Sequence, residues 1–176
     1  MDEIRHFCYE CGSRLLWQEI EGRPRESCPN CGWVYYRQLK VSAAALIIQN
    51  DQLLLLRRAQ SPFAGTWYLP AGYVEADEDP ALAAVRETFE ETGLRVVNRQ
   101  LLEAILFTDD PRGNGLLLVY ACDLVGEAPA LPANQNREIS EAGFFKREAL
   151  PPNLCGAGHA QAILRWVKHS YPAADA

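Results

Sequence analysis

Residues 72–94 read GYVEADEDPALAAVRETFEETGL, and this stretch decides the fold because it specifies a helix with a defined start and end. Asp79 is a residue type that caps helix N-termini, and Pro80 suits the first helical position. Gly93 can adopt the left-handed conformation that ends a helix. The sequence therefore predicts a helix over Pro80–Thr92.

This helix is predicted to have two different faces. At about 100° per residue, three apolar side chains fall on one narrow face that we expect to pack on a sheet. They are Leu82, Val85 and Phe89. Three carboxylates fall together on the opposite side, namely those of Glu87, Glu90 and Glu91.

The carboxylate cluster has two interpretations. Like charges at this spacing destabilise a helix by roughly a few tenths of a kcal/mol per pair, and a bound cation would remove that cost. Oxygen ligands suit Mg²⁺ or Mn²⁺, and Mg²⁺ commonly also binds phosphate oxygens of a substrate. A solvated acidic helix face is the alternative. The metal interpretation predicts a ligand that carries phosphate.

Strands are predicted on both sides of the helix. Ala43–Gln49 and Leu53–Arg57 flank the turn Asn50-Asp51 and are typical of a hairpin. Pro62–Gly72, rich in Gly and Pro, is predicted to be a loop. The remaining predicted elements are strands at Arg95–Phe107, Leu116–Leu124 and Gly143–Phe145, and a terminal helix at Gly158–His169.

Four of the six cysteines form the pattern C-x2-C-x16-C-x2-C near the start of the chain. This doubled spacing is typical of a site where four thiolates hold a structural Zn²⁺ and leave no position open for substrate. The predicted ligands are Cys8, Cys11, Cys28 and Cys31. Ordinary reduced or disulfide-linked cysteines are the alternative. We therefore predict a zinc ribbon at residues 1–40 and a second domain at 41–176.

Taken together, these motifs resemble a known family. Gly72, Glu78 and the run Arg86–Leu94 match the spacing of the 23-residue Nudix box, except that Thr88 stands where the family usually has an aliphatic residue. The preceding segment Gly65–Gly72 also resembles the family's lead-in, with Ala71 in place of the first glycine of a pair. The match indicates that residues 41–150 belong to a Nudix hydrolase.

The resemblance implies an α/β/α sandwich with a mixed sheet, preceded here by the ribbon. It also implies hydrolysis of a nucleoside diphosphate linked to another group. Glu78 would support the adjoining loop, and Arg86 would orient a glutamate. The implied ligands of catalytic Mg²⁺ or Mn²⁺ are the Gly72 carbonyl, Glu87, Glu90 and Glu91.

The expected reaction is in-line attack of water on one phosphorus of a pyrophosphate. One of the box glutamates or Glu138, in the loop Pro132–Glu141, is expected to take the proton from water, although Glu138 could equally be a solvated loop acid. Four residues are candidates for substrate binding, with surface charge and aromatic packing as the alternatives. They are Arg57, Arg58, Trp67 and Tyr73. Phe63 is a further aromatic candidate.

The combination of ribbon and box resembles both NADH pyrophosphatases and ribbon-bearing ADP-ribose/FAD pyrophosphatases. The Ser-Gln-Pro-Trp-Pro-Phe-Pro stretch of the NADH enzymes does not follow Leu94, so ADP-ribose or FAD is the expected substrate. NADH or another nucleotide stays as an alternative. A further alternative is a non-catalytic nucleotide sensor that binds nucleic acid through the ribbon, but residues 1–40 contain six basic and six acidic residues, without the positive footprint such binding needs.

Charge and hydropathy agree with a small-molecule enzyme. The 176 residues carry 17 Lys+Arg and 23 Asp+Glu, a net charge of −6, which disfavours general attraction to nucleic acid or anionic lipid. No apolar run approaches the ~20 residues of a membrane span, and Met1–His6 lacks the features of a secretion signal. A cytoplasmic location without a membrane partner is expected, and the resemblance implies a homodimer.

Overall fold

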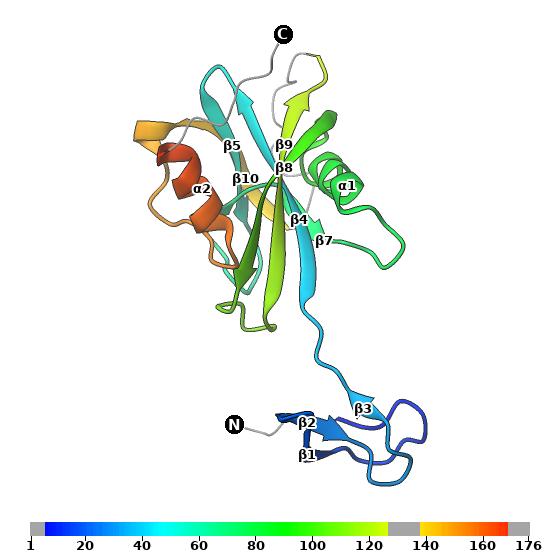
Figure 1. Cartoon of the computed structure of the whole chain (residues 1–176). Coiled ribbons are helices and arrows are strands. Elements are labelled where there is room, and N and C mark those ends of the chain that lie inside the picture. Colours follow the sequence, from blue (N-terminus) through cyan, green and yellow to red (C-terminus); the bar gives the residue numbers. More distant parts are fainter. Residues whose placement is uncertain (1–5, 127–137, 169–176) are drawn as a thin grey trace. The chain divides into compact units, whose positions relative to one another are not determined.

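The computed structural model describes residues 6–126 and 138–168, and the chain divides into two compact units, Met1–Gln38 and Leu39–Ala176. Each unit contains its own sheet (Figure 1). The first unit holds three antiparallel strands, β1 (Leu16–Ile20), β2 (Arg23–Ser27) and β3 (Val34–Tyr35), in the order β1-β2-β3.

The second unit is built on a seven-stranded sheet with a central path of β10-β5-β4-β9-β8. β4 runs parallel to β9, whereas the other pairs of named strands are antiparallel, so the sheet is mixed. The elements of this unit are β4 (Lys40–Gln49), β5 (Gln52–Arg58), β6 (Trp67–Tyr68), β7 (Ala71–Tyr73), α1 (Pro80–Thr92), β8 (Val96–Phe107), β9 (Gly115–Leu124), β10 (Ile139–Lys146), the 3-10 helix η1 (Arg147–Ala149) and α2 (His159–Lys168).

The sheet separates two hydrophobic cores because β4 is buried on both faces. Alternate side chains of a strand point to opposite faces, so Ala43, Ala45 and Ile47 enter the core beneath α1. Ala44 and Leu46 enter the core that contains Trp166 of α2. The two helices thus cover opposite faces of the sheet (Figure 1). This arrangement confirms the predicted α/β/α sandwich with a mixed sheet.

Helix α1 has the predicted bounds, and both of its ends follow the expected chemistry. The side chain of Asp79 accepts a hydrogen bond from the backbone N–H of Ala81 at 2.7 Å, and Pro80 occupies the first turn. At the other end Gly93 has a φ of +71°, and its N–H donates to the carbonyl of Phe89. Local sequence alone is therefore enough to start and stop this helix.

The predicted packing face of α1 is correct for Val85, which packs against the core beneath the helix, and wrong for Leu82 and Phe89. Leu82 and Phe89 are 62% and 48% exposed, while Ala83, Ala84 and Thr88 are fully buried against the sheet. Small side chains let the helix backbone approach the strands closely, which larger ones would prevent. The hydroxyl of Thr88 donates to the carbonyl of Ala84 at 2.7 Å, so this departure from the usual box residue is accommodated within the helix.

The sheet opens between β4 and β5, and the segment predicted to be a loop contains short strands that pair with the edges of this opening. The two strands pair only beside their turn, where Ile48 faces Leu53 and Gln49 faces Gln52. Further along, β7 pairs with β4 and β6 pairs with β5. The predicted loop Pro62–Gly72 therefore contains β6 and the start of β7, because the diverging strands present backbone groups that need partners.

The strand and helix predictions after α1 differ from the structure mainly at their ends. β10 is longer than the predicted Gly143–Phe145 because it pairs with β5 along most of its length. α2 begins at His159, after Gly158 with a φ of +86°, whereas the predicted end at His169 lies outside the described residues. No helix in the described part of the chain is long and apolar enough to cross a membrane.

Replacing Ala84 by Leu should lower the free energy of unfolding by about 1–3 kcal/mol, because a large side chain would be forced into the contact between α1 and the sheet. Leu82→Ala is the matched control on the same helix, and it should change stability by less than about 0.5 kcal/mol because Leu82 is mostly exposed. Urea unfolding followed by circular dichroism measures both. A larger loss for Leu82→Ala would contradict the observed packing face.

Candidate active site

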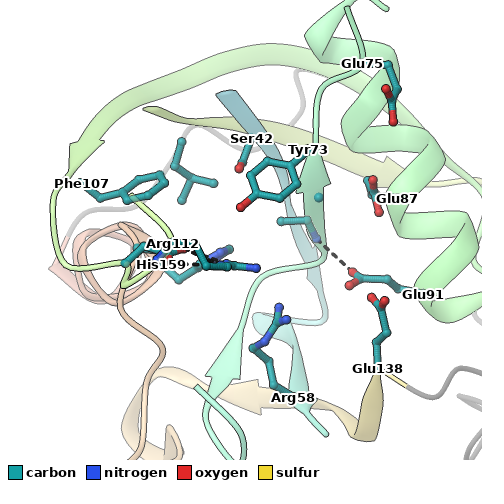
Figure 2. A pocket seen from close by; sticks show the side chains of 15 residues that line it. Ser42, Arg58, Tyr73, Glu75, Glu87, Glu91, Phe107, Arg112, Glu138 and His159 are labelled. Atoms are coloured by element: carbon teal, nitrogen blue, oxygen red, sulfur yellow. Dashed lines mark hydrogen bonds and ion pairs between the residues drawn. The ribbon is translucent and has the colours of Figure 1, made fainter. Parts of the chain in front are cut away.

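The opening in the sheet leaves a cavity of about 310 Å³ beside α1. Its walls come from β4, β5, β7, α1, the β8–β9 connection and the start of α2, which are far apart in the sequence. Figure 2 shows the carboxylates of Glu75, Glu87 and Glu91 on one side and Phe107, Arg112 and His159 on the other. The lining residues are Ser42, Arg58, Ala71, Gly72, Tyr73, Glu75, Glu87, Glu91, Phe107, Asp110, Arg112, Leu117, Glu138, Ala157 and His159.

Arg86 holds the acidic side of the cavity together. Its Nε and Nη2 donate to the two carboxylate oxygens of Glu78, each at 2.8 Å. Its Nη1 donates to Glu87 at 2.7 Å and to Glu90 at 3.2 Å, and Nη2 also donates to the Tyr73 carbonyl at 3.1 Å. The hydrogen bond from Arg86 lowers the pKa of Glu78, so the pair stays charged. One guanidinium thus joins α1 to the segment that precedes it.

Glu91 is fixed from two directions. The hydroxyl of Tyr68 donates to its Oε1 at 2.6 Å, and the backbone N–H of Ala71 donates to its Oε2 at 3.0 Å. Burial, followed by the neighbouring Glu91 carboxylate, raises the pKa of Tyr68 well above its usual range, so Tyr68 remains a donor. Burial also raises the pKa of Glu91 to about 8, although both hydrogen bonds oppose this shift.

Gly72 is required by the close approach of β7 to α1. A Cβ at this position would lie 2.1 Å from the carboxyl carbon of Glu87, well inside van der Waals contact. The glycine of the box therefore leaves the space that the Glu87 carboxylate occupies. Any larger residue would displace that carboxylate from the cavity.

The donor chemistry on this wall fits a divalent cation. Glu87 and Glu91 present hard oxygen donors to one cavity, and each carboxylate raises the free energy of ionising a like-charged neighbour. Within the described ranges, however, only the four cysteines bring three or more ligand atoms within 4.8 Å of one another. Glu87 and Glu90 are hydrogen-bonded to Arg86 instead, so a cation would have to draw them away from that guanidinium.

The structure brings some of the predicted substrate and proton-transfer residues to the cavity. Arg58, Tyr73 and Glu138 line it, alongside Gly72, Glu87 and Glu91. Arg58 also lies over the ring of Tyr68, 5.2 Å from its centroid. Arg58 lies on β5, Tyr73 lies on β7 and Glu138 directly precedes β10, and only the sheet topology places them together.

Other predicted residues are not among those that line the cavity. Arg57 pairs with Glu141 at 2.5 Å and donates to the Gly65 carbonyl at 3.1 Å. Trp67 packs edge-on against Phe145, with ring centroids 4.8 Å apart. Phe63 packs against both hydrophobic cores, and Glu90 is held by Arg86 with its side chain 54% exposed. In this structure, packing and ion pairing hold these side chains outside the cavity lining.

Sequence reasoning missed three features of the site. Tyr68 lies in the predicted loop Pro62–Gly72 and has no role predicted from the sequence, yet its hydroxyl donates to Glu91. Arg112 donates to Asp110 at 2.7 Å and lies 5.7 Å from the Tyr73 ring centroid. His159 begins α2 and lines the cavity. No local motif marks Arg112 or His159, because they reach the cavity from the β8–β9 connection and from α2, which are distant from α1 in the sequence.

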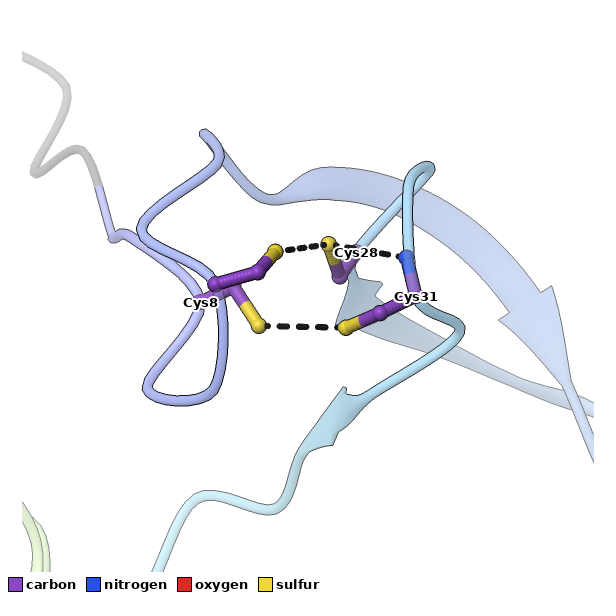
Figure 3. A group of neighbouring side chains, drawn as sticks. Cys8, Cys28 and Cys31 are labelled. Carbon is purple, nitrogen blue, oxygen red and sulfur yellow. Dashed lines mark hydrogen bonds between the residues drawn. The ribbon is translucent and has the colours of Figure 1, made fainter.

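The four cysteines form a separate site in the first unit (Figure 3). The two knuckles have equivalent hydrogen bonds: Gly12 N–H donates to the Cys8 carbonyl at 2.9 Å, and Gly32 N–H donates to the Cys28 carbonyl at 3.0 Å. The φ angles of these glycines are +72° and +79°. Local turn geometry therefore presents both cysteine pairs in the same way.

The sulfur positions fit a tetrahedral ion and exclude disulfides. Cys8 and Cys31 Sγ atoms lie 3.5 Å apart, as do those of Cys11 and Cys28. A tetrahedral ion with metal–sulfur bonds of about 2.3 Å needs sulfurs about 3.8 Å apart, whereas a disulfide needs about 2.05 Å. All six cysteines of the chain are free. The four-cysteine cluster could therefore hold a metal ion.

A helix-borne carboxylate cluster over a cavity in an α/β/α sandwich defines the class of protein, and the comparisons agree. Residues 38–167 match the NUDIX domain family, so the chain belongs to this family, as the box predicts. A crystal structure of a NUDIX hydrolase from Nitrosomonas europaea is similar, with a TM-score of 0.77 and 27% identity over 95% of this chain and 94% of that chain.

Two curated relatives carry more specific names. The chain is 35% identical over 146 residues to the NAD-capped RNA hydrolase NudC of Pseudomonas aeruginosa, covering 83% of this chain and 49% of that protein. It is 36% identical over 117 residues to the ADP-ribose pyrophosphatase of Methanocaldococcus jannaschii, covering 66% and 67%. The chain thus spans about half the length of its NudC relatives.

Arg86→Met should lower the free energy of unfolding by about 1–3 kcal/mol, because it leaves the Glu78 carboxylate, only 16% exposed, without its partner. Removing both charges with Arg86→Met and Glu78→Met should recover part of that loss. Chemical unfolding of the two single variants and the double variant gives the coupling. Strictly additive losses would show that the guanidinium does not stabilise this wall.

Proposed function

We propose that this chain is a divalent-metal-dependent hydrolase of the pyrophosphate bond in a nucleoside diphosphate joined to another group, with ADP-ribose or FAD as the preferred substrate. The single observation that carries the proposal is the shared cavity, where Glu87 and Glu91 of α1 face Arg58. Acidic donors on one side and a guanidinium on another suit a cation and a diphosphate together. The relative from Methanocaldococcus jannaschii, named an ADP-ribose pyrophosphatase, supports the choice of substrate.

Several residues of the chain would have distinct roles in this reaction. Mg²⁺ or Mn²⁺ held by Glu87, Glu90, Glu91 and the Gly72 carbonyl would neutralise the diphosphate and acidify a water. Arg86 orients Glu87 and Glu90, while Tyr68 and the Ala71 N–H orient Glu91.

Two cavity-lining residues would act on the water and the diphosphate. Glu138 stands within the same cavity and is our candidate to accept the proton of the attacking water. Arg58, at the end of β5, would bind a diphosphate oxygen.

A panel of substrates tests the activity. ADP-ribose, NADH, FAD, dinucleoside polyphosphates and oxidised dNTPs should be assayed with Mg²⁺ and with Mn²⁺. We expect ADP-ribose or FAD to give the highest kcat/KM, with cleavage to two monophosphates. Release of no phosphorylated product from any substrate with either metal would overturn the proposal and favour a nucleotide-sensing role.

RNA with a nucleotide cap is a second candidate substrate, because the relatives that cover most of this chain are named NAD-capped RNA hydrolases. The net charge of −6 and the balanced charge of residues 1–40 argue against broad RNA affinity. A capped oligonucleotide added to the panel distinguishes the two. Faster cleavage of the cap than of free NADH would favour the RNA substrate.

We also propose that the four cysteines hold a structural Zn²⁺, that the chain works in the cytoplasm and that it forms a homodimer. None of the six cysteines forms a disulfide, as is usual in a reducing compartment, and this supports the cytoplasmic proposal. The sulfur spacing supports zinc. Light scattering of the purified chain tests the dimer.

Glu91→Gln should reduce kcat at least about 100-fold and weaken Mn²⁺ binding, because it removes the charge of a ligand while preserving its shape. The fold should survive, since the Gln carbonyl can accept from the Ala71 N–H while its NH2 donates to the Tyr68 oxygen. Glu148→Gln, an exposed acid on η1, is the matched control. Unchanged turnover in Glu91→Gln would contradict the proposal that the α1 carboxylates hold the catalytic metal.

Cys28→Ser should lower the zinc content from about one ion per chain to near zero, because the closed site needs four thiolates. Cys155→Ala, a buried thiol of the second unit, should keep its zinc. Elemental analysis of both purified variants makes the comparison. Equal zinc content in the two variants would exclude the four-cysteine site.

A further inference from the structure

The cavity wall opposite α1 contains a polar side chain to which the proposed hydrolysis gives no role. His159, the first residue of α2, is only 8% exposed and lines the cavity. Figure 2 shows His159 beside Arg112, across the cavity from Glu87 and Glu91. His159 therefore lies on a different side of the cavity from Glu87 and Glu91.

The ring of His159 is held in place but is not satisfied. It packs edge-on against Tyr68, with centroids 5.6 Å apart and planes at 85°, and its backbone N–H donates to the Gly156 carbonyl at 3.2 Å. Its Nδ1 is buried and has no hydrogen-bond partner among residues 6–126 and 138–168. Buried polar atoms are nearly always paired, and because the side chain of His159 lines the cavity, a ligand bound there is the candidate partner.

The neighbouring polar groups are mostly engaged with each other. Arg112 is hydrogen-bonded to Asp110 at 2.7 Å. The carboxylate of Asp109 accepts the N–H of Ala157 at 3.1 Å, so the backbone that leads into α2 already has an anionic partner. Arg58 supplies the nearby positive charge. Arg58 Nε is the other buried side-chain atom of this cavity that has no hydrogen-bond partner among the described residues, and a guanidinium suits the diphosphate. The Nδ1 of His159 is therefore the uncharged group that remains for another part of the ligand.

The imidazole of His159 is neutral near pH 7. Burial lowers its pKa to about 3, and the charge of Arg58 acts in the same direction. A neutral imidazole offers one donor and one acceptor. That pairing matches a hydroxyl group, which both donates and accepts. A phosphate would favour a charged imidazole, and an apolar ring would leave Nδ1 unsatisfied.

We propose that His159 forms a subsite that binds a hydroxyl of the sugar adjoining the diphosphate. This inference rests on the proposed function, since it assumes that the diphosphate lies between Arg58 and the acidic residues of α1. A cavity of about 310 Å³ is at the small end of ligand sites, which suits a diphosphate with its adjoining sugar. His159 is thus a residue that determines specificity, and it has no part in bond cleavage.

The test compares three substrates with wild-type protein and with His159→Phe, which keeps a ring against Tyr68 and deletes both nitrogens. The substrates are ADP-ribose, its 2′,3′-dideoxyadenosine analogue, and the n-pentyl ester of ADP, which lacks the distal sugar. Gln161→Ala, an exposed residue on the same helix, is the matched control and should match wild type on all three.

For wild-type protein we expect kcat/KM to fall about tenfold on one of the two analogues, the size of one neutral hydrogen bond. His159→Phe should lose about tenfold on ADP-ribose, chiefly through KM, and show no further loss on that analogue. The analogue affected identifies which sugar is bound. An equal loss on all three substrates, or no loss on any, would overturn the subsite.

Two further measurements test the hydrogen bond of His159 independently of the loss of its ring nitrogens and of turnover. His159→Gln retains a donor and an acceptor and should keep the preference for ADP-ribose over the affected analogue; loss of that preference would count against a hydrogen bond. Calorimetric binding of ADP-ribose in EDTA tests the subsite without turnover. An affinity about tenfold weaker in His159→Phe supports it even if no hydrolysis occurs, whereas equal affinities overturn it.

Discussion

The candidate active site depends on the close approach of α1 to the sheet. Ala83, Ala84 and Thr88 leave little side-chain bulk between the helix and β4, and Gly72 leaves none where β7 passes Glu87. Because the helix backbone lies this close, the carboxylates of Glu87 and Glu91 reach the cavity directly. A helix that packed through Leu82 and Phe89 would present a different face to the sheet, and its acidic residues would point into solvent.

The second requirement is a gap in the sheet for these carboxylates to face. β4 and β5 separate beyond their hairpin turn, and the short strands β6 and β7 take up the edges that this separation exposes. The connection between β6 and β7 runs beside Glu91, which receives hydrogen bonds from Tyr68 and Ala71. The same distortion of the sheet therefore creates the cavity and fixes a carboxylate inside it.

The cysteine unit is held together by local turns and has only a small apolar core. Each pair of cysteines is presented by a turn whose hydrogen bonds lie within a few residues, and the apolar core around Cys8, Leu15 and Cys28 is small. Such a unit has too little buried surface to be stable without further support, which a metal ion supplies in many small domains. The second unit, with a core on each face of its sheet, has no such need.

Short-range spacing by itself determined the helix Pro80–Thr92, its caps, the hairpin at Asn50-Asp51, the cysteine knuckles and the Nudix box, because each depends on residues close in the chain. The tertiary structure alone decided which face of α1 is buried. The periodicity of large apolar residues favours the face with Leu82 and Phe89, but the smaller Ala and Thr side chains allow a closer approach to the sheet. It also decided that Tyr68 and His159 join the site while Arg57 and Trp67 do not. Those contacts link strands and helices distant in the chain, and only the order and divergence of the strands bring them together.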